Sequence, residues 1–129
     1  MNSPHELLVD DGIRIAESLL TPGTPLDWTS SPARANQFGL TTDWDRNVVD
    51  ESKVVALREV SLANYSLAKD KFKTIYDFYI TIEDKNGNKF QEIGRAPSGR
   101  ASQQINVERI VLYRNSTAKL RVQLWSTAV

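Results

Sequence analysis

The chain of 129 residues is 40% hydrophobic and 25% charged, and its formal net charge is zero. This composition is typical of one globular domain that is large enough to bury its own core. There is no cysteine and only one histidine, His5, which excludes disulfides, thiolate catalysis and metal sites built from cysteine or several histidines. No apolar run approaches the ~20 residues that a membrane-spanning helix needs. From the length of the chain, we expect residues 1–129 to form a single domain.

The charge is unevenly spread along the chain. Residues 1–50 hold eight acids and three bases, whereas residues 51–129 hold eight acids and thirteen bases. One acid, Glu108, stands among six bases of the second half: Arg95, Arg100, Arg109, Arg114, Lys119 and Arg121. These bases are candidates for a surface that binds an acidic ligand. Solvated charges with internal pairing are the alternative, and we favour that interpretation.

The first predicted helix runs from Glu6 to Leu20. At ~100° per residue its apolar side chains fall on one arc: Leu8, Val9, Gly12, Ile13, Ile15, Ala16, Leu19 and Leu20. The opposite arc is polar and is expected to face solvent: Asp10, Asp11, Arg14, Glu17 and Ser18. A glycine inside a helix costs ~1 kcal/mol relative to alanine, so Gly12 predicts a close approach by another element. Ser3 and Pro4 are candidates for the helix cap and the first helical residue, although residues 1–4 are also compatible with a cloning remnant.

The segment Thr21-Pro-Gly-Thr-Pro25 is predicted to end this helix. Pro22 disfavours helix at the preceding residue, and Gly23 can adopt a positive φ. The chain from Leu26 to Asp50 is then expected to be irregular. A segment of that length needs buried anchors to stay ordered, and the candidates are Trp28, Phe38, Leu40 and Trp44. Trp28 is expected to pin the turn to the rest of the domain.

Two short helices and four strands follow. Asp50 or Ser52 is expected to cap a helix with Val54, Leu57 and Val60 inward, and a second helix is expected over about Leu62 to Phe72. The pattern then alternates, which predicts strands. Asn86-Gly87 predicts a first hairpin, the loop Gly94 to Ser102 follows, and a second hairpin turns at Asn115-Ser-Thr. The predicted class is therefore α+β, with the N-terminal amphipathic helix packed on one face of a four-stranded antiparallel meander and two short helices between.

A long N-terminal helix on a four-stranded antiparallel sheet resembles the globular part of type IV pilins and pseudopilins. Four segments resemble more specifically the archaeal pilin-like, membrane-anchored surface proteins: IAESLLTPGTPLDW at 15–28, FGL at 38–40, YDFYITIED at 76–84 and VERIVLYRNSTAKLRVQLW at 107–125. The resemblance implies a processed class III leader and a hydrophobic N-terminal helix half ahead of this sequence. It therefore implies that these residues are the soluble ectodomain of a longer extracellular protein.

Three kinds of candidate site in the sequence also have simpler structural interpretations. Asp43, Asp45 and Asn47 resemble the start of a calcium loop. Val48 and Val54 stand where an EF-hand needs Gly and Glu, so a helix-capping polar loop is the favoured interpretation. The carboxylate pairs Asp10-Asp11 and Glu83-Asp84 are not expected to converge, because adjacent side chains point apart. Two sequons for N-glycosylation begin at Asn64 and Asn115, of which Asn115 is the better candidate because it lies at a predicted hairpin tip.

The leading functional hypothesis is a non-enzymatic extracellular pilin-like subunit for surface filament assembly or adhesion, with other pilin-like subunits as partners and no cofactor or nucleic acid. Its structural residues would be Gly12, Pro22, Gly23 and Trp28, and the soluble fragment is expected to be monomeric. The alternative is a soluble binding module that uses the basic residues of 95–121 for an acidic ligand. A small hydrolase with carboxylate chemistry is the third hypothesis, and it would need a cleft with converging acids.

Overall fold

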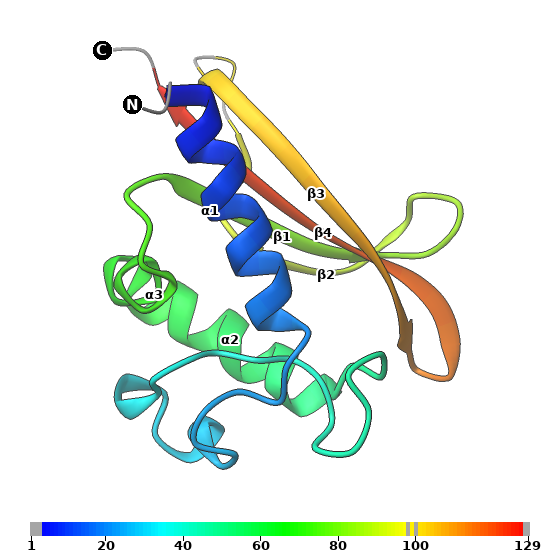
Figure 1. Ribbon diagram of the computed structural model, residues 1–129. Helices are drawn as coiled ribbons and strands as arrows, with labels where there is room; N and C mark the ends of the chain where they lie inside the picture. The colour runs from blue at the N-terminus through cyan, green and yellow to red at the C-terminus, as the bar shows by residue number, and fades with distance from the viewer. Residues whose placement is uncertain (1–3, 98, 100, 128–129) are drawn as a thin grey trace.

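The computed structural model describes residues 4–97, 99 and 101–127 (Figure 1). The elements follow one another in the order helix, irregular segment, two helices and four strands. Their bounds are α1 Pro4–Leu19, the short 3-10 helices η1 Trp28–Ser30 and η2 Pro32–Arg34, α2 Glu51–Ala63, α3 Tyr65–Phe72, β1 Asp77–Glu83, β2 Lys89–Gly94, β3 Ala101–Tyr113 and β4 Ser116–Thr127. The predicted α+β class, with its break between the two short helices, is confirmed.

The four strands form one antiparallel sheet in the order β2-β1-β4-β3. The predicted meander is wrong, because the chain leaves β2 at one edge of the sheet and enters β3 at the other edge. Instead of β2 pairing with β3, β1 pairs with β4, from Asp77 opposite Trp125 to Glu83 opposite Lys119. This order places two strands with strongly apolar inner faces at the centre of the sheet, where both of their edges are paired.

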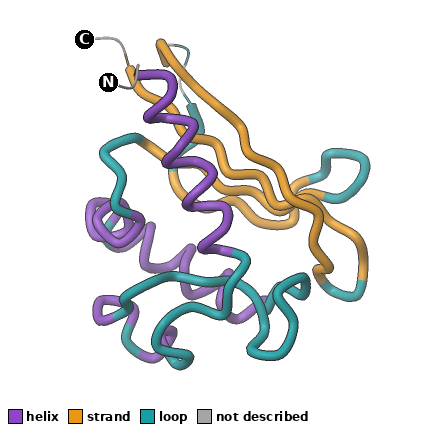
Figure 2. The backbone as a smooth tube through the Cα atoms, in the orientation of Figure 1, coloured by secondary structure: helices purple, strands orange, loops and turns teal. Residues whose placement is uncertain are grey.

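All three α-helices lie on one face of the sheet (Figures 1 and 2). α1 contacts β3 and β4, and α2 contacts β2 and α3. The core between the layers is built from alternate strand residues and one stripe of each helix, as the periodicity predicts. Its fully buried members include Leu8, Ile15, Leu19, Phe38, Leu57, Phe78, Ile80, Ile82, Leu120, Val122 and Leu124.

Both hairpins exist, but their loops differ from the prediction. The second hairpin turns over Arg114 and Asn115, which have φ values of 53° and 64°, so it is a two-residue loop of the type I′ kind one residue earlier than predicted. In the first hairpin the amide of Gly87 donates to the carbonyl of Asp84 over 3.1 Å, and Gly87 has a φ of +85°. That loop is a type I turn with a glycine bulge rather than a two-residue Asn-Gly turn.

Two predicted core residues are instead exposed. Ile13 of α1 is 42% exposed, and Trp44 is 83% exposed. The predicted anchors Trp28, Phe38 and Leu40 are buried, as expected. The apolar arc of α1 is therefore narrower than predicted, and Trp44 is held on the surface by the polar loop around it.

Candidate functional site at the end of α1

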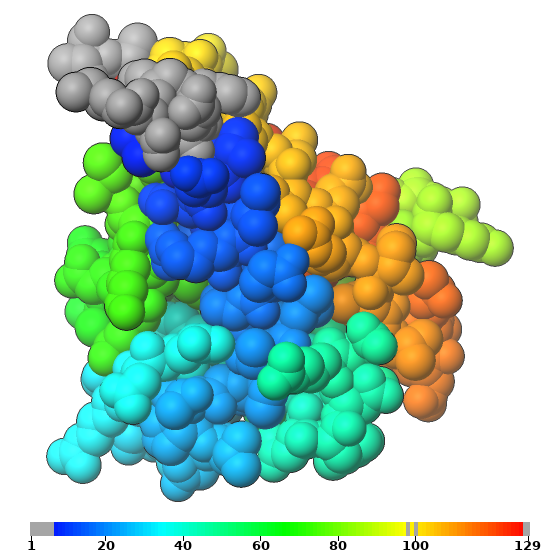
Figure 3. Space-filling view, in the orientation of Figure 1, coloured from blue at the N-terminus to red at the C-terminus, as the bar shows by residue number. Residues whose placement is uncertain are grey.

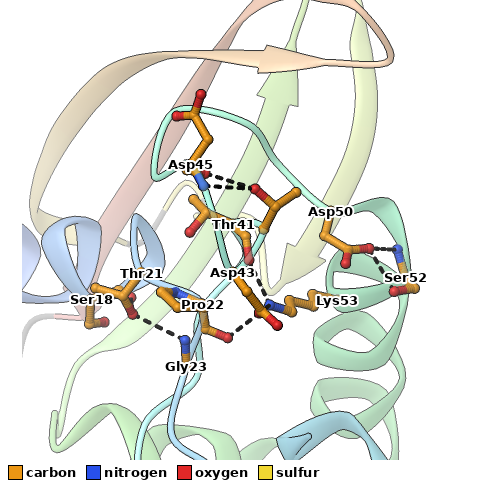
Figure 4. Close-up of polar contacts among 11 residues, drawn as sticks. Ser18, Thr21, Pro22, Gly23, Thr41, Asp43, Asp45, Asp50, Ser52 and Lys53 are labelled. Atoms are coloured by element: carbon orange, nitrogen blue, oxygen red, sulfur yellow. Dashed lines mark hydrogen bonds and ion pairs between the residues drawn. The ribbon is translucent and has the colours of Figure 1, made fainter. Parts of the chain in front are cut away.

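A buried ammonium group joins three segments at the C-terminal end of α1. Lys53 of α2 has only 6% of its surface exposed. Its Nζ donates to the carbonyl of Thr41 over 2.6 Å and to the carbonyl of Pro22 over 3.0 Å, and it lies 3.2 Å from Oδ1 of Asp43 (Figure 4). A charge buried at this depth needs such partners, because burial without them carries a large desolvation cost. We call Lys53 and these three partners the Lys53 cluster.

The first turn of α2 sets the position of Lys53. Asp50 is the N-cap, since its Oδ1 accepts from the amide of Ser52 over 2.9 Å and from its hydroxyl over 2.6 Å. Side chains of a helix lean toward its N-terminus, so Lys53 in this first turn points back toward the segment that precedes the helix. The amide of Asp50 also donates to the carbonyl of Leu40 over 2.7 Å. The predicted helix cap is confirmed, and it directs the ammonium into the cluster.

The segment 39–41 closes the end of α1. The amide of Leu40 donates to the carbonyl of Leu19 over 2.9 Å, and the amide of Thr41 donates to the carbonyl of Thr21 over 3.2 Å. The last carbonyls of a helix have no partner within the helix. The irregular segment therefore satisfies the end of α1 while Lys53 holds that segment in place.

Two glycines allow this tight crossing. Gly23 has a φ of +91°, and a Cβ there would overlap the indole ring of Trp28. A Cβ at Gly39 would overlap the backbone of Thr21 and Pro22. Trp28 is 1% exposed, so the prediction that it pins the turn is confirmed. Gly39 was not singled out from the sequence.

α1 is tied to the domain on both sides as well as at its end. The Arg14 guanidinium donates to the carbonyls of Phe72 over 2.6 Å and Lys73 over 3.0 Å, at the end of α3. On the other side Glu17 accepts from Arg109 of β3 over 2.8 Å. The polar arc of α1 faces solvent as expected at Arg14 and Glu17, which are exposed, and their charged ends also reach neighbouring elements because α1 lies between α3 and β3 (Figure 3).

The close approach predicted at Gly12 is also confirmed. A Cβ at Gly12 would lie 2.5 Å from Cδ1 of Ile105 and 3.3 Å from Cγ2 of Val107. Both residues belong to β3, so the glycine lets α1 lie directly on this strand.

The calcium candidates hold other contacts. Asp43 pairs with Lys53, and Oδ1 of Asp45 accepts from the amide of Asn47 over 2.8 Å. Among the described residues no group of three or more acidic, His or Cys side chains could hold a metal ion. At Asp43 the positive charge is supplied by the chain itself, as the ammonium of Lys53.

The candidate basic residues do not form one surface. Arg109 binds Glu17 on the helix side of β3, and Arg114 binds Glu51 with its Nε 3.2 Å from Oε2. This hydrogen bond and the guanidinium charge lower the pKa of Glu51. The guanidinium of Arg95 lies 4.0 Å from the ring centroid of Tyr65. Arg100 lies outside the described residues.

The remaining two bases lie on the helix-free face of the sheet within an ion-pair network. Lys119 lies 2.9 Å from Oε2 of Glu108, and Arg121 lies 3.5 Å from Glu83 and 3.6 Å from Glu108. The hydrogen bond from Lys119 lowers the pKa of Glu108. Glu83 is buried and also accepts from the Thr81 hydroxyl over 2.6 Å. Internal pairing, the favoured interpretation of the basic residues, accounts for these contacts.

The candidate carboxylate pairs and sequons also have structural contacts. Asp11 binds Arg14 and Thr74, and Asp84 accepts the amides of Asn86 and Asn88, so neither carboxylate joins its neighbour in a shared site. The side chain of Asn64 caps α3 by accepting from the amide of Leu67 over 3.1 Å. Asn115 is exposed at the tip of the β3–β4 hairpin, as predicted.

Comparisons of the chain with protein-family models, with curated proteins and with solved structures find no match. Within the part of the chain that the structure describes, no helix combines the length and apolar character needed to cross a membrane.

Proposed function

We propose that the domain is the extracellular head of a non-enzymatic, membrane-anchored subunit similar to archaeal pilins, used in a surface filament or in adhesion. The observation that carries the proposal is the fixation of α1. This helix lies along the sheet, is tied to α3 and β3 by Arg14 and Glu17, and is closed at its end by the Lys53 cluster. A helix held in this way suits a stalk that continues from a membrane anchor into a head.

The arrangement of the two ends supports the same proposal. The N-terminal end of α1 lies at one end of the molecule, and the irregular segment 21–50 lies at the other (Figure 1). A subunit anchored through residues ahead of α1 would therefore present the Lys53 cluster and the loops around it away from the membrane. The sequence resemblance to archaeal pilin-like proteins points to the same topology.

The structure offers less support for the alternative, a module that binds an acidic ligand through residues 95–121. Of the described bases there, Arg109, Arg114, Lys119 and Arg121 are paired with carboxylates. Exposed pairs of this kind cost little to open, so binding of heparin at low salt is the direct test of this alternative.

The proposed function is tested on the complete gene product. Its coding sequence should place a hydrophobic stretch of ~20 residues and a short leader ahead of α1. The native protein should sediment with membranes, and protease added to intact cells should remove the head. A complete coding sequence without a hydrophobic stretch, or a head protected in intact cells but cleaved after lysis, would contradict the proposal.

A further inference from the structure

Two segments of the chain match the acceptor pattern for N-linked glycosylation, and the fold treats them differently. The pattern is Asn-x-Ser/Thr, and it occurs as Asn64-Tyr-Ser66 and as Asn115-Ser-Thr117. A match to so short a pattern is common by chance. The structure around each asparagine therefore decides whether a glycosyl-transferring enzyme can reach its side chain.

The Asn64 site is locked into the first turn of α3. Oδ1 of Asn64 caps this helix by accepting from the amide of Leu67 over 3.1 Å. The next residue, Tyr65, stacks on Phe78 of β1 with the ring centroids 4.9 Å apart, and its hydroxyl accepts from the amide of Phe78 over 2.9 Å. An enzyme that acts on a folded protein needs a segment that can leave the surface locally. At Asn64 this would unwind the start of α3 and pull Tyr65 away from the sheet.

The Asn115 site lies at the tip of the β3–β4 hairpin. Asn115 is exposed in the two-residue turn with a φ of 64°, and its side-chain amide has no hydrogen-bond partner among the described residues. Ser116 and Thr117, which complete the site, are exposed as well. The turn explains an asparagine here, because Asn tolerates a positive φ. It makes no demand for a hydroxyl two residues later, so the acceptor pattern is not a by-product of the turn.

The first residues of β4 can separate from β3 without disturbing the core. β4 pairs with β1 only as far as Lys119, so Ser116 and Thr117 pair with β3 alone. β3 does not depend on this pairing, because on its other edge the amide of Leu112 donates to the carbonyl of Asn47 over 2.7 Å. Local opening of this kind needs less free energy than global unfolding. The acceptor segment can therefore become extended while the domain stays folded.

The hairpin tip also lies where a sugar would meet both solvent and exposed apolar side chains. It is at the end of the sheet opposite the start of α1 (Figure 1), so a subunit anchored ahead of α1 would turn it away from the membrane. Leu112, which pairs with Thr117, is 42% exposed. Phe90 is 37% exposed and shares a groove with Ser116 and Thr117. A glycan on Asn115 would cover these apolar side chains.

We propose that Asn115 carries an N-linked glycan, added to the folded head by an oligosaccharide-transferring enzyme on the outer side of the membrane, and that Asn64 carries none. A bond forms between Nδ2 of Asn115 and the anomeric carbon of a sugar held on a lipid phosphate or pyrophosphate. The bond from that carbon to the phosphate oxygen breaks, the lipid phosphate leaves, and the side-chain amide loses one proton, so nothing is oxidised or reduced. The inference rests on the proposed function, because only a head outside the membrane meets this enzyme.

The first experiment examines the full-length protein recovered from its native cells. Cleavage after glutamate places Asn64 in the peptide 60–83 and Asn115 in the peptide that begins at Arg109. Mass spectrometry should find the second peptide heavier by the mass of a glycan, and fragmentation should place the sugar on Asn115. The peptide 60–83 should have the mass of its sequence, because its asparagine is held in the cap of α3.

The second experiment changes the acceptor pattern but keeps the asparagine of the turn. Thr117→Val preserves the shape of the side chain and removes the hydroxyl that the pattern requires, so the added mass should be lost. Thr117→Ser keeps the pattern and should retain the glycan. Ser116→Ala is the matched control on the neighbouring exposed hydroxyl, and it should leave the added mass unchanged. An added mass that survives Thr117→Val, or that disappears in Ser116→Ala, would overturn the proposal.

Protease treatment of the same intact cells separates this inference from the proposed function. A head that protease removes but whose Asn115 is unmodified would overturn the inference and leave the proposed function standing, and a glycan on Asn64 would do the same. A glycan on Asn115 of a chain without a hydrophobic anchor would support the inference and refute the membrane-anchored function. A head that is protected in intact cells and unmodified would refute both.

Discussion

Removal of the buried ammonium tests the role given to the Lys53 cluster. Lys53→Met keeps the length of the side chain but leaves the carbonyls of Thr41 and Pro22 without their donor. Each buried acceptor that loses its partner costs about 1–3 kcal/mol. Thr41 is fully buried, whereas Pro22 is partly exposed, so water can replace the donor at Pro22 and its cost lies at the low end of this range.

The net loss for Lys53→Met is smaller than the sum of the two costs, because the variant no longer has to desolvate a charge. We expect the free energy of unfolding to fall by about 2–3 kcal/mol, out of a typical 5–15 kcal/mol. For a chain of this size the melting temperature should fall by roughly 6–15 °C. Urea unfolding followed by circular dichroism gives the free energy, and calorimetry gives the melting temperature.

Two variants make the Lys53 test specific. Lys71→Met changes a half-buried lysine with no ion pair among the described residues, and its free energy of unfolding should stay within about 0.5 kcal/mol of the parent. Asp43→Asn should cost less than about 1 kcal/mol, because the Asp43 side chain is 54% exposed. Equal effects of Lys53→Met and Lys71→Met would refute the reasoning, since the buried carbonyls would then not need the ammonium.

Four further variants test the close contacts and the tyrosine environment, each followed by urea unfolding. Gly23→Ala should lower the free energy of unfolding by at least about 2 kcal/mol, because it adds an overlap with Trp28 to the cost of a positive φ. The control is Gly87→Ala, which has a φ of +85° but open space around the new Cβ, and it should cost only about 1 kcal/mol. Equal costs for the two variants would contradict the packing argument. Gly12→Ala should change the free energy of unfolding by less than about 1 kcal/mol, because the gain in helix propensity offsets the cost of moving the flexible end of the Ile105 side chain. A larger loss would mean that this side chain cannot move. Burial, and then the hydrogen bond to Glu92, raises the pKa of Tyr79 to about 12. The tyrosine therefore ionises first in the unfolded state, and the free energy of unfolding should fall as the pH rises from about 10 to 12. Tyr79→Phe should reduce this dependence on pH, and an unchanged dependence would assign it to other groups.

The periodic parts of the sequence predicted the elements and their buried faces. Phe78, Ile80 and Ile82 alternate with polar residues, and the structure buries them against the helices. The strand order was not predictable in the same way, because a period of two identifies the inner face of a strand but not its neighbour. The hairpin signals correctly joined β1 to β2 and β3 to β4, yet nothing local indicated that β1 would pair with β4.

The Lys53 cluster is hard to predict because two of the three partners of Lys53 are backbone carbonyls. No residue type indicates that the carbonyls of Pro22 and Thr41 will face inward, and a lysine in a helix is normally read as part of a solvated face. Trp44 was misread for a related reason. Its position in the irregular segment resembles that of the buried Trp28 and Phe38, but Asp43 and Asp45 on either side are a local signal that Trp44 belongs to a polar surface loop.

If α1 continues from a membrane anchor, as we propose, a force applied through this helix reaches the contacts that tie it to the domain. Such a pull would act on the contacts of Arg14 with the end of α3, of Glu17 with β3, and of the helix end with the segment 39–41. The Lys53 cluster matters most in this geometry, because it fixes the segment that closes the far end of α1 to the first turn of α2. Every globular domain must satisfy the ends of its helices, and the anchor that we propose would add the further demand that α1 stay fixed when a force acts on its first turn.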